Sequence, residues 1–86
     1  MKPYTKIYMR AFGYGLEDFI ACEVCGNKAV DIHHIENKKM GGSKTKDEIQ
    51  NLMALCRECH LRYGDKKEHK AMLQSKHDYW LDVNGL

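Results

Sequence analysis

The 86-residue sequence has no long apolar run, a single proline and almost no net charge. Its longest apolar stretches, 19–22 and 52–56, fall far short of the roughly 20 residues that span a membrane. The N-terminus lacks an apolar segment followed by a small-residue cleavage site, so we expect no signal peptide and a cytoplasmic, intracellular protein. The short length excludes a large enzyme scaffold, and an apolar content of 43% argues against disorder. We therefore expect a single domain over residues 1–86.

The four cysteines form two matched pairs, Cys22 with Cys25 and Cys56 with Cys59. Two such C-x-x-C knuckles can complete a tetrahedral shell of four sulfurs, the usual structural Zn²⁺ site. A redox or disulfide role and four unrelated buried thiols are the alternatives, although disulfides are rare in intracellular proteins and no βαβ pattern is visible. The 30 residues between Cys25 and Cys56 exceed the roughly 15–20 of a simple zinc ribbon. Something is therefore inserted between the knuckles.

Residue periodicity predicts a small mixture of strands and helices. Short strands are expected over 4–9, 29–35 and 51–55. A capping box predicts a helical turn at 45–48. A helix is expected to begin at residue 59 and to end or bend at Gly64 and Asp65, and an amphipathic helix is expected over 66–82. Residues 38–44 are predicted to form a loop that is basic and flexible at its two glycines. The apolar face of the last helix is expected to include Leu73, Trp80 and Val83.

Polar residues with metal-binding chemistry occupy the segment between and just after the knuckles. His33 and His34 lie on the 29–35 strand, Asn51 opens the next strand, and His60 opens a helix. If the hairpin and the helix pack together, this cluster can hold a divalent cation on imidazole and leave positions open for water and phosphate oxygen. Each histidine taken alone is more often an ordinary surface or zinc-adjacent residue. Their joint spacing favours a site.

These motifs closely resemble the HNH endonuclease family over residues 22–63. The matching residues are Asp31 to Ile35, Gly41 and Gly42, Asn51 to Cys56, and Cys59 with His60. Sixteen residues separate His34 from Asn51, and eight separate Asn51 from His60, as the family pattern expects. The resemblance implies an α+β fold of the ββα-metal type: a two-stranded antiparallel hairpin plus a helix, stapled by the four-cysteine zinc site. The helix over 66–82 is additional to that core.

The resemblance also implies roles for the matching residues. His34 would be the general base that takes a proton from the attacking water, while His33 and His60 would bind a catalytic divalent ion (Mg²⁺, Mn²⁺, Ni²⁺ or Zn²⁺). Asn51 would brace the loop and help orient His34. Some family members carry a further histidine ligand four residues after the His60 position, where this chain has a glycine. Asp31 is then either a third ligand or an aspartate outside the ligand shell.

The expected activity is hydrolysis of phosphodiester bonds in DNA, by nicking or cutting with little sequence specificity. Residues 36–46 and 57–76 each carry a local charge of +3, which suits contacts to the phosphate backbone. The candidate contacts are Lys38, Lys39, Lys44, Arg57 and Arg62. The family also implies an accessory role in phage or mobile-element DNA processing, within a larger phage or host assembly. The alternative is a catalytically idle zinc-binding module that binds nucleic acid or protein.

Overall fold

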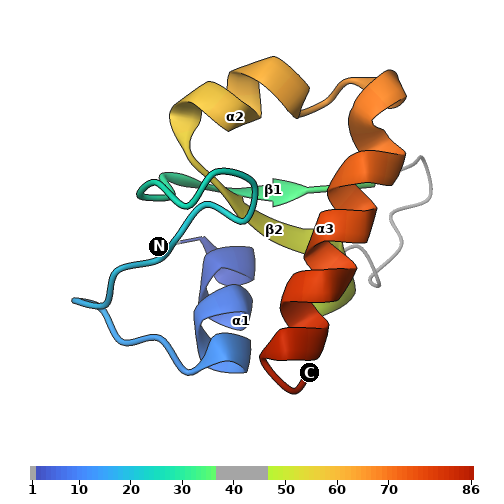
Figure 1. Ribbon diagram of the computed structural model, residues 1–86. Helices are drawn as coiled ribbons and strands as arrows, with labels where there is room; N and C mark the ends of the chain where they lie inside the picture. The colour runs from blue at the N-terminus through green and yellow to red at the C-terminus, as the bar shows by residue number, and fades with distance from the viewer. Residues whose placement is uncertain (1, 37–46) are drawn as a thin grey trace.

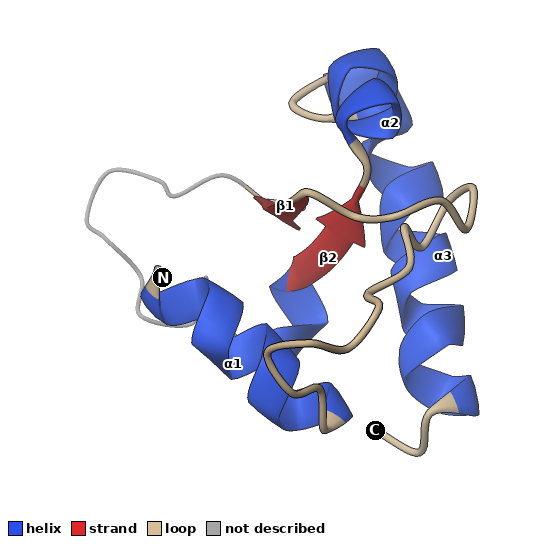
Figure 2. Cartoon of the chain, turned by 90° about the vertical axis from the view of Figure 1, so that its left-hand side faces the viewer, coloured by secondary structure: helices blue, strands red, loops and turns tan. Residues whose placement is uncertain are grey.

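A short antiparallel hairpin lies at the centre of the molecule, between helices on its two faces (Figure 1). The computed structural model describes residues 2–36 and 47–86. Strand β1 (Asp31–His34) pairs with β2 (Leu52–Leu55), and the register places Asp31 opposite Leu55 and His34 opposite Leu52. Figure 2 shows the same hairpin after a turn of 90°, with α1 and α2 on opposite sides of it. The predicted two-stranded antiparallel hairpin is thus confirmed.

Strand β2 is buried on both faces and separates two apolar clusters. Met53 and Leu55 pack with the cysteines and with Leu73, whereas Leu52 and Ala54 pack against Tyr8. Successive strand residues point to opposite faces, so four consecutive apolar residues are what a strand covered on both faces requires. The same alternation directs neighbouring residues of β1 to different sides of the hairpin.

Helix α1 (Pro3–Phe12) replaces the strand predicted over residues 4–9, and that prediction is wrong. Proline at the first helical position suits a helix start, and Gly13 ends the helix in the left-handed region at φ 73°. Tyr4, Tyr8 and Phe12 recur every fourth residue, so they share one face of the helix. That face packs against the side of the hairpin that carries Leu52 and Ala54. Loose alternation over six residues concealed this longer helical period.

The two helices after the hairpin follow the predictions, although the first of them begins two residues earlier than predicted. The 3₁₀ turn η2 (Ile49–Asn51) leads into β2, α2 (Arg57–Tyr63) follows it, and the 3₁₀ turn η3 (Lys67–His69) leads into α3 (Lys70–Val83). The predicted face of the last helix needs correction, because Val83 is exposed and the fully packed residues are Leu73, His77 and Leu81. No helix within the described ranges is long and apolar enough to span a lipid bilayer.

Candidate metal centres

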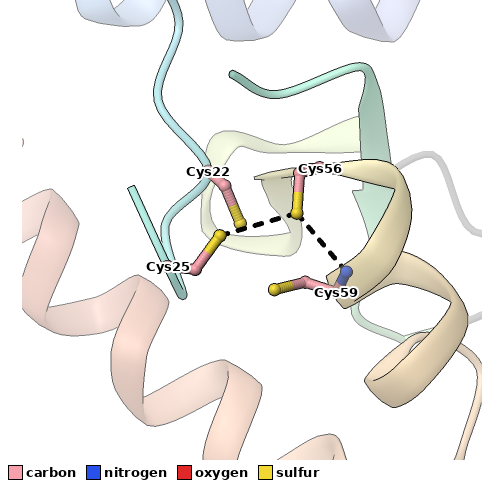
Figure 3. Close-up of side chains that lie close together, drawn as sticks. All are labelled: Cys22, Cys25, Cys56 and Cys59. Atoms are coloured by element: carbon pink, nitrogen blue, oxygen red, sulfur yellow. Dashed lines mark hydrogen bonds between the residues drawn. The ribbon is translucent and has the colours of Figure 1, made fainter. Parts of the chain in front are cut away.

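The four cysteines converge on one point between the loop after α1 and the start of α2. Their sulfurs all lie within 4.8 Å of one another, and all four side chains point inward (Figure 3). The Sγ atoms of Cys25 and Cys56 are 3.5 Å apart, close to the roughly 3.8 Å that tetrahedral geometry gives for Zn–S bonds of about 2.3 Å. All four cysteines fall within the described ranges, and each is a free thiol. The donors therefore fit a closed zinc site.

The local electrostatics show why such a cluster needs a cation. Burial raises the pKa of Cys22, but backbone N–H groups of Cys56, Cys25 and Val24 outweigh it and lower the pKa to about 7. For Cys59, burial and then the neighbouring sulfurs raise the pKa, because a second thiolate would lie beside the first. Four sulfurs cannot all ionise at this spacing without positive charge between them. A divalent ion supplies that charge.

A second cluster of metal-binding groups lies where β1, α2 and the turn after α2 meet. Donor atoms of His33, His60 and Asp65 lie within 4.8 Å of one another, and the two imidazole centroids are 5.0 Å apart. Donors on one divalent ion are separated by about 3–4 Å, so small side-chain rotations bring the three to that spacing. Burial lowers the pKa of His33, and the nearby His60 lowers it further, which favours the neutral ligand form. The residues present fit an open site with two imidazoles and one carboxylate.

Asp31 lies behind His60 rather than among the donors. Its Oδ2 accepts a hydrogen bond from Nδ1 of His60 at 3.0 Å. That contact fixes the tautomer, so Nε2 of His60 carries the free lone pair. Nε2 lies on the side of Gly64, the residue before Asp65. Of the two roles left open for Asp31, the geometry favours the one outside the ligand shell.

The turn after α2 is shaped by two backbone features. A Cβ at Gly64 would collide with the ring and the carbonyl oxygen of His60, so glycine lets that ring lie over the end of the helix. Asp65 follows in the left-handed region at φ 61°, a conformation that aspartate tolerates better than most residues. Together they bring a carboxylate to the two imidazoles. The glycine thus stands where some family members carry a ligand, and the next residue places a carboxylate beside the two imidazoles.

His34 points to the opposite face of the hairpin from His33. Its Nε2 lies 2.8 Å from Oδ1 of Asp47, and its ring makes an edge contact with Tyr4 of α1 at 4.7 Å between centroids. An imidazole that donates from Nε2 to a carboxylate keeps a lone pair on Nδ1, which is the form that accepts a proton. A hollow of about 210 Å³ joins the two histidines, lined by Tyr4, Ile32, His33, His34, His60 and Asp65.

The side chain of Asn51 is hydrogen-bonded to the backbone of Glu36, two residues after His34. Its Oδ1 accepts from the backbone N–H of Glu36 at 2.7 Å, and its Nδ2 donates to the carbonyl oxygen of Glu36 at 3.1 Å. The backbone oxygen of Asn51 also accepts from the N–H of Ile35 at 2.9 Å. The asparagine touches neither imidazole in these contacts. It extends the strand pairing by side-chain bonds, and the role that the resemblance implies for it, bracing the loop and helping to orient His34, stays a prediction.

The structure describes two of the five basic residues proposed to contact nucleic acid. Lys38, Lys39 and Lys44 lie outside the described residues. Arg57 is 71% exposed and has its Nε 3.7 Å from Asp31, while Arg62 pairs with Glu58 at 3.5 Å on the outer face of α2. Exposed pairs of this kind contribute little to stability, so both guanidinium groups remain accessible to a partner.

A family model described as HNH endonuclease matches residues 22–66, just over half of the chain. The chain belongs to the HNH endonuclease family. The matched range contains both cysteine knuckles, the hairpin, α2 and the turn with Asp65. Comparison with curated proteins and with solved structures gives no match. Within the HNH range, the structure therefore supplies what the family pattern alone does not, namely which side chains meet.

Two aspartates of this HNH site escaped the sequence analysis. Asp47 was assigned to a capping box at 45–48, whose first two residues lie outside the described ranges. Asp65 was taken only as a helix-ending residue, although it follows the glycine that stands at a known ligand position of the family. The available signal for Asp65 was a carboxylate directly after a position where some family members carry a histidine ligand and this chain carries glycine. Nothing in the sequence marked the pairing of Asp47 with His34.

Proposed function

We propose that this protein is a metal-dependent endonuclease that hydrolyses phosphodiester bonds in DNA, by nicking or cutting with little sequence specificity. The observation that carries the proposal is the hollow shared by two different histidines. On one side His33 stands with His60 and Asp65, and on the other His34 stands with Asp47. The ligand cluster and His34 thus both line one hollow, although the two histidines lie on opposite faces of β1.

The residues of the hollow divide the chemistry between them. His33, His60 and Asp65 would hold the catalytic ion, which when bound neutralises charge that develops on the phosphate and on the leaving oxygen. His34 takes the proton of the attacking water on Nδ1, and Asp47 stabilises the imidazolium that results. Asn51 keeps the backbone after His34 in place. Asp31 holds the ring of His60 in the tautomer that leaves Nε2 available.

Little sequence specificity is expected because the basic groups suit phosphate contacts rather than base contacts. Lysine and arginine on phosphate oxygens position a duplex without reading it. Affinity should then fall steeply with salt and differ little between unrelated duplexes. The phage or mobile-element role, and a larger assembly, stay predictions from the family.

Incubation of the zinc-loaded protein with supercoiled plasmid across Mg²⁺, Mn²⁺, Ni²⁺ and Zn²⁺ tests this proposal. Nicked or linear product that requires one of these ions and disappears in the His60→Ala variant supports it. The His69→Ala variant is a matched control, because His69 lies outside the ligand cluster and contacts Tyr63 instead. A mobility shift of the plasmid without cleavage under any ion would contradict the nuclease and favour the idle binding module.

A further inference from the structure

A second hollow lies beside the proposed catalytic one and shares two of its walls. It has a volume of about 280 Å³, and His33 and Asp65 separate it from the first. Its remaining lining residues come from the end of β1, from η3 and from the first turns of α3: Ile35, Lys66, Lys67, Lys70 and Leu73. Three of these are lysines, and Ile35 and Leu73 are buried, so the hollow has an apolar base and a basic rim.

The three lysines differ in how the described residues hold them. Lys66 donates from Nζ to the carbonyl oxygens of Leu61 and Arg62 at 2.9 and 3.0 Å, which caps α2. Lys70 forms an ion pair with Glu36 at 3.0 Å. The side chain of Lys67 is exposed, and its ammonium makes no hydrogen bond or ion pair with any residue in the described ranges. Each ammonium has three donors, so all three lysines keep protons to offer an anion.

The position of this hollow decides which anion suits it. At about 280 Å³, the hollow is many times larger than a single water needs, so it has room for a phosphate group with part of its hydration shell. His33 and Asp65 form the shared wall, so an anion here lies next to the ion that they would bind. The carboxylate of Asp65 repels an anion while it is unligated and ceases to do so once it binds a cation.

We propose that this hollow is a second phosphate subsite, in which Lys67, assisted by Lys66 and Lys70, holds a backbone phosphate next to the one in the catalytic hollow. The inference rests on the proposed function, since it assigns the hollow to the same nucleic acid strand. It makes Lys67 a binding residue that fixes where the strand lies relative to His33 and Asp65. It also predicts that metal occupancy and strand binding strengthen each other.

The test measures binding alone, so that it does not depend on cleavage. A fluorescently labelled DNA duplex is titrated with parent protein, Lys67→Gln and Lys76→Gln by fluorescence anisotropy, over a series of salt concentrations and without added divalent metal. Lys76 is the matched control, because it lies on α3 but lines a separate hollow with Tyr79 and Trp80. Circular dichroism and bound zinc should be the same in all three proteins.

One phosphate contact changes the slope of log affinity against log salt by about 0.9, which corresponds to about eightfold in affinity at 0.1 M salt. We expect Lys67→Gln to show both changes, Lys76→Gln to show neither, and Lys67→Arg to restore parent binding. Equal slopes for the two glutamine variants would overturn the subsite. If the parent protein binds the duplex but cuts with no ion, the proposed function fails, while the contrast between Lys67 and Lys76 still decides the subsite.

Metal coupling provides an independent arm of the same experiment. Asp65→Asn should tighten metal-free binding of the duplex, because it removes the like charge in the wall. The same change made at Asp78, on the outer face of α3, should have no comparable effect. Weaker or unchanged metal-free binding by Asp65→Asn would contradict the placement of the phosphate beside this carboxylate.

Discussion

The ring nitrogen Nδ1 of His77 donates to Oε1 of Glu23 at 2.6 Å, and both side chains are fully buried. Glu23 lies inside the first cysteine knuckle, and its other oxygen accepts from the hydroxyl of Tyr8 at 2.5 Å and from the N–H of Ala54 at 3.1 Å. Nε2 of His77 lies 2.6 Å from the carbonyl oxygen of Ile49. One carboxylate therefore ties the zinc knuckle to α1, β2 and α3.

Removing the imidazole should destabilise the fold strongly. His77→Leu leaves the carboxylate of Glu23 buried without its cationic partner, and breaking a buried pair in this way costs about 3–5 kcal/mol. Urea unfolding of the zinc-saturated protein, followed by circular dichroism, measures the change. Tyr79→Leu, at a residue that is 68% exposed on the same helix, should change stability far less. Equal effects of the two substitutions would show that the pair is energetically unimportant.

The same pair should make stability depend on pH. Burial by itself would lower the pKa of His77, but the hydrogen bond and the charge of Glu23 outweigh it and raise the pKa. Both ring nitrogens face acceptors, which requires the doubly protonated ring. A raised folded pKa means that this contribution is fully present below the unfolded value of about 6.5 and is lost as pH rises through the folded pKa.

The stability difference between the parent and a Glu23→Gln/His77→Leu double variant isolates this effect, because no unpaired buried carboxylate is left behind and both proteins carry the same pH dependence of zinc binding. We expect the difference to be largest near pH 6 and to shrink toward pH 9. Urea unfolding at a series of pH values, with zinc in excess, provides the measurement. A difference that grows with pH would mean that the folded protein holds His77 in its neutral form.

The hairpin, α2 and the zinc cluster were predictable because each leaves a local mark in the sequence. Four apolar residues before Cys56 mark a doubly covered strand, and paired cysteines mark the knuckles. Helix α1 was missed because Tyr4, Tyr8 and Phe12 spread their pattern over three turns, and the prediction followed only the six residues from 4 to 9. The packed role of His77 was missed for another reason, since the carboxylate that makes its burial tolerable lies 54 residues away.

The candidate site, too, could be predicted from the sequence only in part. Strand alternation places His33 and His34 on opposite faces of β1, which is compatible with the different roles that the resemblance implies for them. The contribution of Asp65 depends on a left-handed residue after Gly64, and that of Asp47 depends on where the chain returns after residues 37–46. Both are tertiary relationships with no periodic signature. The sequence therefore indicates the histidines and leaves their carboxylate partners open.

The two carboxylates near His60 should both affect metal binding, Asp65 as a ligand and Asp31 through the ring of His60. Asp65→Asn removes a charged ligand and, because asparagine also tolerates the left-handed region, should leave the turn intact while raising the metal requirement at least tenfold. Asp31→Asn removes the carboxylate partner of His60, together with the weak exposed pair with Arg57, and loss of such a partner of a histidine ligand is typically worth about 10–100-fold in metal affinity or activity. Calorimetric titration with Mn²⁺ checks both. Parent affinity in Asp65→Asn would remove this residue from the ligand set.

Structural and catalytic metals should be separable. A four-thiolate zinc site contributes on the order of 10–16 kcal/mol in small domains, whereas two imidazoles and a carboxylate on an open site should exchange their ion readily. Mild chelation should then stop cleavage while circular dichroism stays native, and Cys56→Ser should unfold the chain. A native, zinc-free Cys56→Ser protein would contradict the closed site.

The division of labour between the two neighbouring histidines is most directly tested by the metal dependence of the single-turnover cleavage rate in His34→Ala. The variant keeps His33, His60 and Asp65, so it should bind metal as the parent does. Loss of a general base typically slows the reaction by about 10²–10⁴-fold, which is roughly 3–5.5 kcal/mol of barrier. We therefore expect a rate at least about a hundredfold lower with an unchanged half-saturating metal concentration. A rate near that of the parent together with a raised metal requirement would make His34 a ligand and contradict the account.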